Sequence, residues 1–137
     1  MMKILTTLIS AGALLLAQSV SASPAVDAML KVYRDAGAGP FSAEAGERMW
    51  LEKHSHVESP AERSCGSCHT NNLSDSGKHV KTQKVIKPMT PSVNAKRLTD
   101  TKQIEKWFMR NCKWTFGREC SPQEKGDFLL YIQKSGV

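Results

Sequence analysis

The stretch Cys65-Gly66-Ser67-Cys68-His69 decides the fold of this chain. Two cysteines separated by two residues and followed directly by histidine are typical of a c-type haem attachment site. In such a site each thiolate forms a thioether with a haem vinyl group, and the histidine donates an imidazole nitrogen to the iron. The motif therefore predicts one haem c, bound covalently by Cys65 and Cys68, with His69 as an axial iron ligand.

The first 22 residues predict a secretory signal peptide, which is the context that a haem attachment motif needs. A short basic start, Met1-Met2-Lys3, precedes an apolar run, Ile4–Ala17, which has signal-peptide length and is too short to span a membrane comfortably. The side chains of Val20-Ser21-Ala22 favour cleavage after Ala22. We therefore expect a periplasmic protein whose single domain covers residues 23–137. No later segment is apolar enough to cross a membrane.

The formal net charge of the whole chain is +6. This basic surplus favours an acidic redox partner, and simple solubilisation is the alternative explanation. We find no stripe of basic and aromatic residues that would indicate nucleic-acid binding.

Cys112 and Cys120 are the two cysteines that the haem motif does not use. In an oxidising compartment they are most simply explained as a disulfide, which contributes on the order of 2–3 kcal/mol for a loop this small. A zinc site formed by all four cysteines is the alternative. It is less favoured because the second pair lacks the tight spacing of a zinc knuckle.

Helical periodicity and capping residues predict a small all-α domain around the motif. Gly126, inside the last predicted helix, indicates a close helix crossing, because glycine costs roughly 1 kcal/mol there relative to alanine. Residues 54–64 and 71–91 are expected to be loops, with a short extended piece at Val85-Ile86. The expected helices begin at Pro24 (ending before Gly37), after Ser42 (to about Lys53), at Cys65 (to about Thr70), at Thr101 (to about Lys113) and at Pro122 (to about Lys134). This layout predicts a monohaem class I-like cytochrome c.

The predicted helix 101–113 carries a polar residue on its apolar face. Ile104, Trp107, Phe108, Asn111 and Cys112 recur at helical spacing. A buried amide is costly unless it finds partners. Asn111 therefore either hydrogen-bonds a backbone carbonyl or a haem propionate, or binds the iron through its amide oxygen. Trp107 and Phe108 are candidate walls of the haem pocket.

Met89 is the rival for the position opposite His69. It lies in the loop Lys87-Pro88-Met89-Thr90-Pro91, where an electron-carrying cytochrome would supply a methionine ligand. Methionine is also a common core residue, and Met109 falls on the polar side of its helix. His54, His56 and His79 are expected to be solvated residues of polar loops.

The stretch from Trp107 to Phe128, with its Arg-Asn-Cys and Gly-Arg-Glu-Cys blocks, resembles the C-terminal signature of the sphaeroides haem protein family. The segments 65–69 and 88–100 agree with it. The resemblance implies a class I-like fold, Asn111 as the sixth iron ligand and a disulfide between Cys112 and Cys120. It also implies that the ligand dissociates on reduction, so that oxygen, nitric oxide or carbon monoxide can bind, and that a dihaem cytochrome c is the electron donor.

Three hypotheses for function follow. In the leading one, reduction removes Asn111 from the iron and a diatomic gas binds. In the second, the protein is a low-spin electron carrier with Met89 as ligand. In the third, the protein is an enzyme that converts a gas bound at the open iron position. Such an enzyme needs a distal hydrogen-bond donor or proton source, and no single residue of the sequence stands out for that role.

Overall fold

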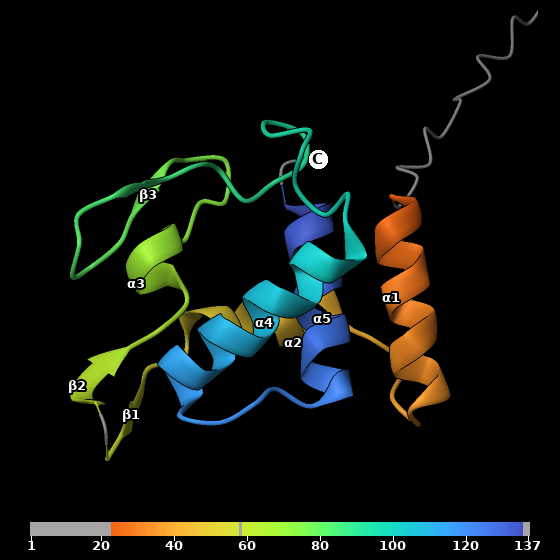
Figure 1. Cartoon of the computed structure of the whole chain (residues 1–137), viewed down its shortest axis with the longest axis horizontal. Helices are drawn as coiled ribbons and strands as arrows, with labels where there is room; N and C mark the ends of the chain where they lie inside the picture. Colours follow the sequence, from red (N-terminus) through yellow and green to blue (C-terminus); the bar gives the residue numbers. More distant parts are fainter. Residues whose placement is uncertain (1–22, 58, 136–137) are drawn as a thin grey trace, which may run out of the picture.

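The helices of this chain surround one core, and short strands flank the haem motif (Figure 1). The computed structural model describes residues 23–57 and 59–135, so the predicted signal peptide lies outside the described residues. The helices are α1 (Pro24–Asp35), α2 (Ala43–Leu51), α3 (Gly66–His69), α4 (Thr101–Phe116) and α5 (Pro122–Lys134). The strands are β1 (His54–His56), β2 (Ser59–Arg63), β3 (Gly77–Lys78) and β4 (Val85–Ile86). The predicted all-α cytochrome fold is confirmed in its main elements.

The starts of the four longer helices follow from their capping residues. The side chains of Ser23, Ser42, Asp100 and Ser121 each accept a hydrogen bond from a backbone N–H in the first turn. Such caps satisfy N–H groups that have no partner within the helix. The structure describes no helix long and apolar enough to cross a membrane.

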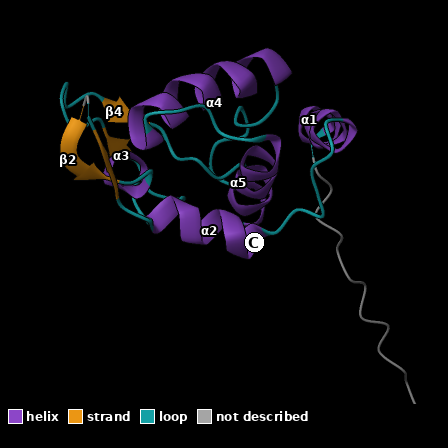
Figure 2. Ribbon diagram, turned by 90° about the horizontal axis from the view of Figure 1, so that it is seen from below, coloured by secondary structure: helices purple, strands orange, loops and turns teal. Residues whose placement is uncertain are grey.

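The core consists of two adjoining clusters of apolar side chains. One cluster joins α1 to α4 and α5 through Val26, Tyr33, Ile104 and Leu129. The other contains Trp50 of α2, Leu73 and several residues of α4 and α5, and it extends to the haem motif at Cys65. Figure 2 shows α1 at one end of the molecule and α3, β2 and β4 at the other. The haem motif therefore lies far from α1.

Helix α2 and the segment just before it approach α5 closely at two glycines. A Cβ atom on Gly46 would lie 2.3 Å from the backbone oxygen of Asp127, and one on Gly126 would lie 2.2 Å from the Phe41 ring. The Asp127 carboxylate is buried and accepts a hydrogen bond from the backbone N–H of Ser42 at 2.7 Å. The close crossing predicted from Gly126 is confirmed, and it fixes the helix that carries Trp50.

Two predictions of local structure are wrong: one loop is a hairpin, and one helix is longer than expected. Within the segment 54–64, expected to be a loop, β1 (His54–His56) and β2 (Ser59–Arg63) pair antiparallel, with His54 opposite Arg63. Its sequence is polar, and backbone pairing of this kind leaves no apolar alternation to detect. Helix α4 extends to Phe116, beyond the predicted end near Lys113, because the left-handed residue that ends it is Gly117, with φ 70°.

We predict that Gly46→Ala destabilises the protein by about 1–3 kcal/mol, because the added methyl group meets backbone atoms of α5. Helix propensity alone predicts the opposite sign, a gain of roughly 1 kcal/mol. Thermal unfolding followed by circular dichroism measures the change. The control is Ala28→Gly on the exposed side of α1, for which propensity alone predicts a loss of roughly 1 kcal/mol. A more stable Gly46→Ala variant would contradict the close crossing.

Candidate haem site

His69 ends the short helix α3, and its imidazole is buried against Trp50. The two ring centroids are 5.5 Å apart. The Nδ1 atom of His69 has no hydrogen-bond partner among the described residues. Burial, together with the positive charges of Arg97 and His79, lowers the pKa of His69 to about 4. The imidazole is therefore neutral at physiological pH, which is the form that binds a metal ion.

Cys65 and Cys68 lie on the same short segment, and both are free thiols. Burial raises the pKa of Cys65 to about 12, while the neighbouring Thr115 side chain acts in the opposite direction. Thr115 belongs to α4 and is itself buried. The C-terminal half of α4 therefore lies directly against the first cysteine of the motif.

The backbone directly after His69 is strained. Thr70 has φ 64° and ψ 170°, a region that residues other than glycine rarely adopt. Its carbonyl accepts a hydrogen bond from Trp50 Nε1 at 2.9 Å, and its hydroxyl donates to the carbonyl of Asn72 at 2.6 Å. Trp50 thus contacts His69 with its ring and holds the next peptide group with its N–H. Neither contact has a local signal in the sequence, because Trp50 is about twenty residues away from both partners.

Strand β3 packs directly on the motif through Gly77. A Cβ atom at this position would lie 2.0 Å from the Cys68 carbonyl oxygen and 2.9 Å from the His69 Cα. Any larger residue would push the β3–β4 hairpin away from α3. Gly77 therefore sets how closely the long loop can approach the motif.

Asn111 is half-buried and lies on the side of α4 that contacts the motif. It precedes Thr115 by four residues, so the two side chains share one face of the helix. Phe108 is partly buried on the same side and packs against both core clusters. Trp107 differs from the expectation of an inward-facing residue. Its side chain is 45 % exposed and lies 5.3 Å below the guanidinium of Arg110.

Trp114, one turn after Asn111, is enclosed by cations from both sides of the motif. The guanidinium carbon of Arg63 lies 4.1 Å from the Trp114 ring centroid, and Lys81 Nζ lies 4.6 Å from it. The His79 ring is 5.8 Å away. Arg63 comes from β2 and Lys81 from the turn between β3 and β4, so this cluster joins two segments that flank the motif to α4. The spacing of these residues in the sequence could not predict this cluster, because they are far apart in the chain.

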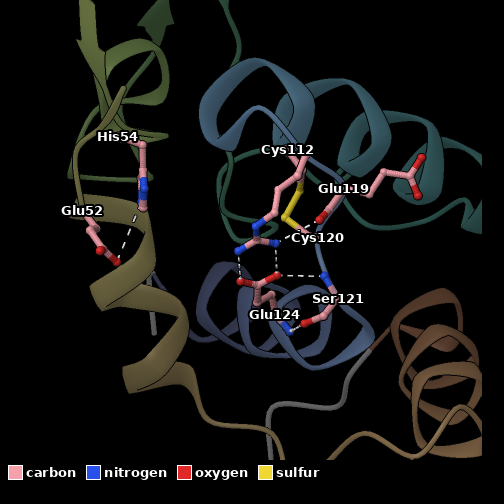
Figure 3. Close-up of polar contacts among 8 residues, drawn as sticks. Glu52, His54, Cys112, Glu119, Cys120, Ser121 and Glu124 are labelled. Atoms are coloured by element: carbon pink, nitrogen blue, oxygen red, sulfur yellow. Dashed lines mark hydrogen bonds and ion pairs between the residues drawn. A yellow bond between two sulfur atoms is a disulfide. The ribbon is translucent and has the colours of Figure 1, made fainter. Parts of the chain in front are cut away.

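A disulfide joins Cys112 to Cys120, with an S–S distance of 2.01 Å (Figure 3). The four-cysteine zinc site therefore does not form. The following turn is held by a capping box between Ser121 and Glu124 and by two hydrogen bonds, of 2.7 and 2.8 Å, from Arg118 to the Glu124 carboxylate. These interactions lower the pKa of Glu124 to about 2, with the Arg118 hydrogen bonds as the largest cause. The backbone directly after Asn111 is thus fixed to the start of α5.

The loop that contains Met89 is held in place by hydrogen bonds to Leu73, which follows the motif, and to Asn94 and Arg97. The backbone N–H of Met89 donates to the carbonyl of Leu73 at 2.9 Å. Asn94 and Arg97 both donate to the carbonyl of Pro88, at 3.1 and 2.9 Å. The Met89 side chain is partly buried against the core cluster that contains Trp50. Arg97 also donates to the carbonyl of Lys87, at 2.7 Å, so its guanidinium is bound to backbone carbonyls of this loop.

Two of the three histidines expected in solvated loops are in the β1 strand. His54 packs edge-on against Phe116 at 4.5 Å, and its Nε2 is buried without a hydrogen-bond partner among the described residues. His56 Nε2 lies 3.3 Å from the Trp114 carbonyl oxygen. Met109 is 48 % exposed and faces a shallow cavity beside Cys120, away from Asn111. The side chains of His54, His56 and Met109 therefore all contact groups other than His69.

The residues of the motif fit a covalently bound haem. Two thiols outside any disulfide and a neutral, buried imidazole without a hydrogen-bond partner are the donor set that a c-type haem requires. Strand β3 contacts the backbone of the motif at Gly77, and α4 contacts Cys65 through Thr115.

Comparison with known proteins agrees with this site. The chain is 36% identical over 100 residues, 73% of its length and 76% of the relative, to the cytochrome c-type protein SHP of Cereibacter sphaeroides. It is 39% identical over 85 residues to cytochrome c'' of Methylophilus methylotrophus; this match spans 62% of the chain and 59% of that relative.

Solved structures of both relatives have the same fold. Oxidised SHP, described as an oxygen-binding cytochrome c, matches with a TM-score of 0.71 at 32% identity, covering 82% of this chain and 98% of that one. Oxidised cytochrome c'' from Methylophilus methylotrophus matches with a TM-score of 0.71 at 30% identity, covering 82% and 96%. A solution structure of cytochrome c'' that addresses haem-ligand detachment in that protein has a TM-score of 0.71 at 32% identity, covering 82% and 94%.

The fold, the motif and these relatives define a c-type cytochrome of class I-like architecture, and they imply haem c as its cofactor. The chain belongs to the family described as a domain of unknown function (DUF1924), which matches residues 36–132. SHP and cytochrome c'' are its similar relatives. The predicted resemblance to the sphaeroides haem protein family is thereby confirmed.

We predict that Trp50→Phe destabilises the protein by about 1–2 kcal/mol, because the Thr70 carbonyl loses its hydrogen-bond donor while the aromatic packing is largely kept. Denaturant unfolding of the haem-loaded protein measures the change. Trp107→Phe is the matched control. It should change stability by less than about 0.5 kcal/mol, since Trp107 is 45 % exposed. Equal effects of the two substitutions would contradict a special role for Trp50.

A second prediction concerns pH. The pKa of Glu124 is lower in the folded chain, at about 2, than its ordinary value of 4.5, so this carboxylate stabilises the fold above pH 4.5. That contribution is lost as the pH falls from 4.5 towards 2. We therefore expect Glu124→Gln to be less stable than the unmodified protein at pH 6, and the difference to shrink by pH 3. Denaturant unfolding at both pH values measures it, and a difference that does not change with pH would contradict the prediction.

Proposed function

We propose that this protein is a periplasmic monohaem cytochrome c whose sixth iron ligand, Asn111, is labile. In this proposal the haem supplies a redox-active iron that, once reduced, binds a diatomic gas such as oxygen, nitric oxide or carbon monoxide. Cys65 and Cys68 hold the haem through thioethers, and His69 is the permanent ligand. Another cytochrome, by the family resemblance a dihaem cytochrome c, supplies the electron. Export depends on residues 1–22, and the mature domain is residues 23–137.

The observation that carries the proposal is the position of Asn111. It shares a face of α4 with Thr115, whose side chain contacts Cys65, and it is followed directly by the disulfide-bonded Cys112. A neutral amide oxygen is a hard donor that tolerates Fe(III) better than Fe(II). Because the disulfide and the Arg118–Glu124 contacts hold the chain after it, Asn111 can move without unwinding α4.

The alternative ligand, Met89, is less favoured by its surroundings. Its backbone is hydrogen-bonded to Leu73, four residues after His69, and the Arg97 side chain holds the preceding peptide groups. Asn111, in contrast, belongs to a separate element that approaches the motif from another direction. The relatives support a labile ligand, since SHP is an oxygen-binding cytochrome c and the solution structure of cytochrome c'' addresses haem-ligand detachment.

The neighbouring side chains have separate roles in this proposal. Trp50 orients His69 and holds the strained Thr70 peptide. Phe108 lines the haem edge on α4, whereas Trp107 is at the surface and has no role at the haem. The cations around Trp114 bring positive charge close to Asn111, where a gas ligand would bind. An enzymatic role in gas conversion would also need a proton donor near the iron, and Lys81, beside Trp114, is a candidate.

Absorption spectra of the ferric and ferrous protein, with and without carbon monoxide, test the proposal. We expect the ferrous protein to be high-spin and to bind carbon monoxide. Asn111→Leu should convert the ferric spectrum to one of an open or water-occupied site, whereas Met89→Leu should leave both spectra unchanged. If Met89→Leu instead abolishes a methionine–iron charge-transfer band and the ferrous protein ignores carbon monoxide, the protein is an ordinary electron carrier and the proposal is wrong.

A further inference from the structure

The positive charge of this chain is concentrated in one segment. Residues 76–99 contain no Asp or Glu, and their six basic residues equal the formal net charge of +6 for the whole chain. The rest of the sequence therefore has equal numbers of basic and acidic residues. The six are Lys78, Lys81, Lys84, Lys87, Lys96 and Arg97. A solubilising charge would not need to be collected in this way.

This segment covers the haem motif. Its β3–β4 hairpin pairs Gly77 with Ile86 and Lys78 with Val85. Through Gly77 it lies in direct contact with the Cys68 and His69 backbone. Figure 1 shows the hairpin passing beside α3, and Figure 2 places β4 and α3 together at the same end of the molecule. The basic segment thus lies directly against the haem attachment site.

The outer face of the hairpin combines exposed apolar side chains with lysines. Val80 is 45 % exposed and Val85 is 70 % exposed. Lys78 is the cross-strand partner of Val85, so the two side chains share one face of the hairpin. Lys87 lies two residues after Val85, just beyond the end of β4, and in extended chain it has the same side-chain direction as Val85. Both lysines are exposed. An apolar centre with a charged rim is typical of protein–protein contact surfaces.

The hairpin is held in place by its other face. Lys81 and His79 contact the Trp114 ring of α4, and Arg97 donates hydrogen bonds to the carbonyls of Lys87 and Pro88. The outer face is therefore already formed before any partner arrives, which lowers the ordering cost of binding.

We propose that Lys78, Val80, Val85 and Lys87 form the docking surface for an acidic electron-transfer protein. The inference rests on the proposed function, since it concerns how the haem is reduced. In the docked complex one electron passes from the reduced partner to the ferric protein, and no proton or atom is exchanged. Carboxylates on the partner pair with the lysine rim, and long-range attraction brings them to the face nearest the haem motif. The exposed apolar residues are small valines, which suit a transient protein contact better than insertion into a membrane.

The test compares two charge-reversal variants of the haem-loaded protein. Lys78→Glu/Lys87→Glu changes the docking surface, and Lys102→Glu/Lys106→Glu changes two exposed lysines of α4 by the same total charge. The probe is reduced plant-type [2Fe–2S] ferredoxin, an acidic one-electron donor, and the measurement is the second-order rate constant of haem reduction by stopped flow. At low ionic strength we expect a fall of about tenfold or more for the first variant and about twofold or less for the second. At high salt the two should converge.

The controls separate the possible explanations. Reduction by an uncharged hydroquinone should proceed at the same rate in all three proteins, and an unchanged ferric spectrum shows that each variant has folded. If both variants slow the ferredoxin reaction equally, only overall charge matters and the proposal is wrong. It is also wrong if the first variant keeps its rate with ferredoxin but loses binding to phosphatidylglycerol vesicles, because the surface then serves a membrane.

Carbon monoxide binding by the ferrous variants is measured in the same experiment. If carbon monoxide fails to bind while the ferredoxin rates differ as expected, the docking surface stands and the labile-ligand function falls. If carbon monoxide binds and the rates do not differ, the reverse holds. The two proposals can therefore fail independently.

Discussion

The buried imidazole of His69 is the constraint on which the rest of this structure depends. A neutral histidine whose buried Nδ1 atom has no partner among the described residues needs neighbours that hold it in one orientation. Trp50 contacts the ring and also binds the carbonyl of the strained Thr70, while Gly77 admits a strand directly behind the motif. Trp50 in turn depends on the α2–α5 crossing at Gly46. The proximal side of the site is thus built into the core packing.

The opposite side is built on α4, and it is held differently. The helix meets the motif through Thr115 and is joined to α5 by the Cys112–Cys120 disulfide and by the capping box at Ser121. Asn111 is therefore attached to a rigid backbone while its own side chain remains only half-buried. The proposed function requires such a rigid support with a movable donor, because in it the ligand dissociates and returns.

The two ends of the molecule differ in charge. The α1 end is a packed helix junction, where Glu105 accepts hydrogen bonds from both Tyr33 and Lys125. The end that carries α3 and the β3–β4 hairpin is basic, and it exposes Val80 and Val85. The parts of the chain that would meet gases or protein partners therefore lie together, and the parts that supply stability lie apart from them.

Much of this protein could be predicted from its sequence, because the signals are local. The Cys65–His69 spacing, the capping serines and the Ser121–Glu124 box each act within a few residues, and they correctly indicated the cofactor class, the helices and the all-α cytochrome fold. The contacts that complete the site join residues far apart in the chain. Trp50 against Thr70, Arg63 and Lys81 on Trp114, and β3 on the Cys68 backbone have no local pattern. Only the packing of the helices decided them, because side-chain burial and hydrogen bonding across the fold depend on which segments meet.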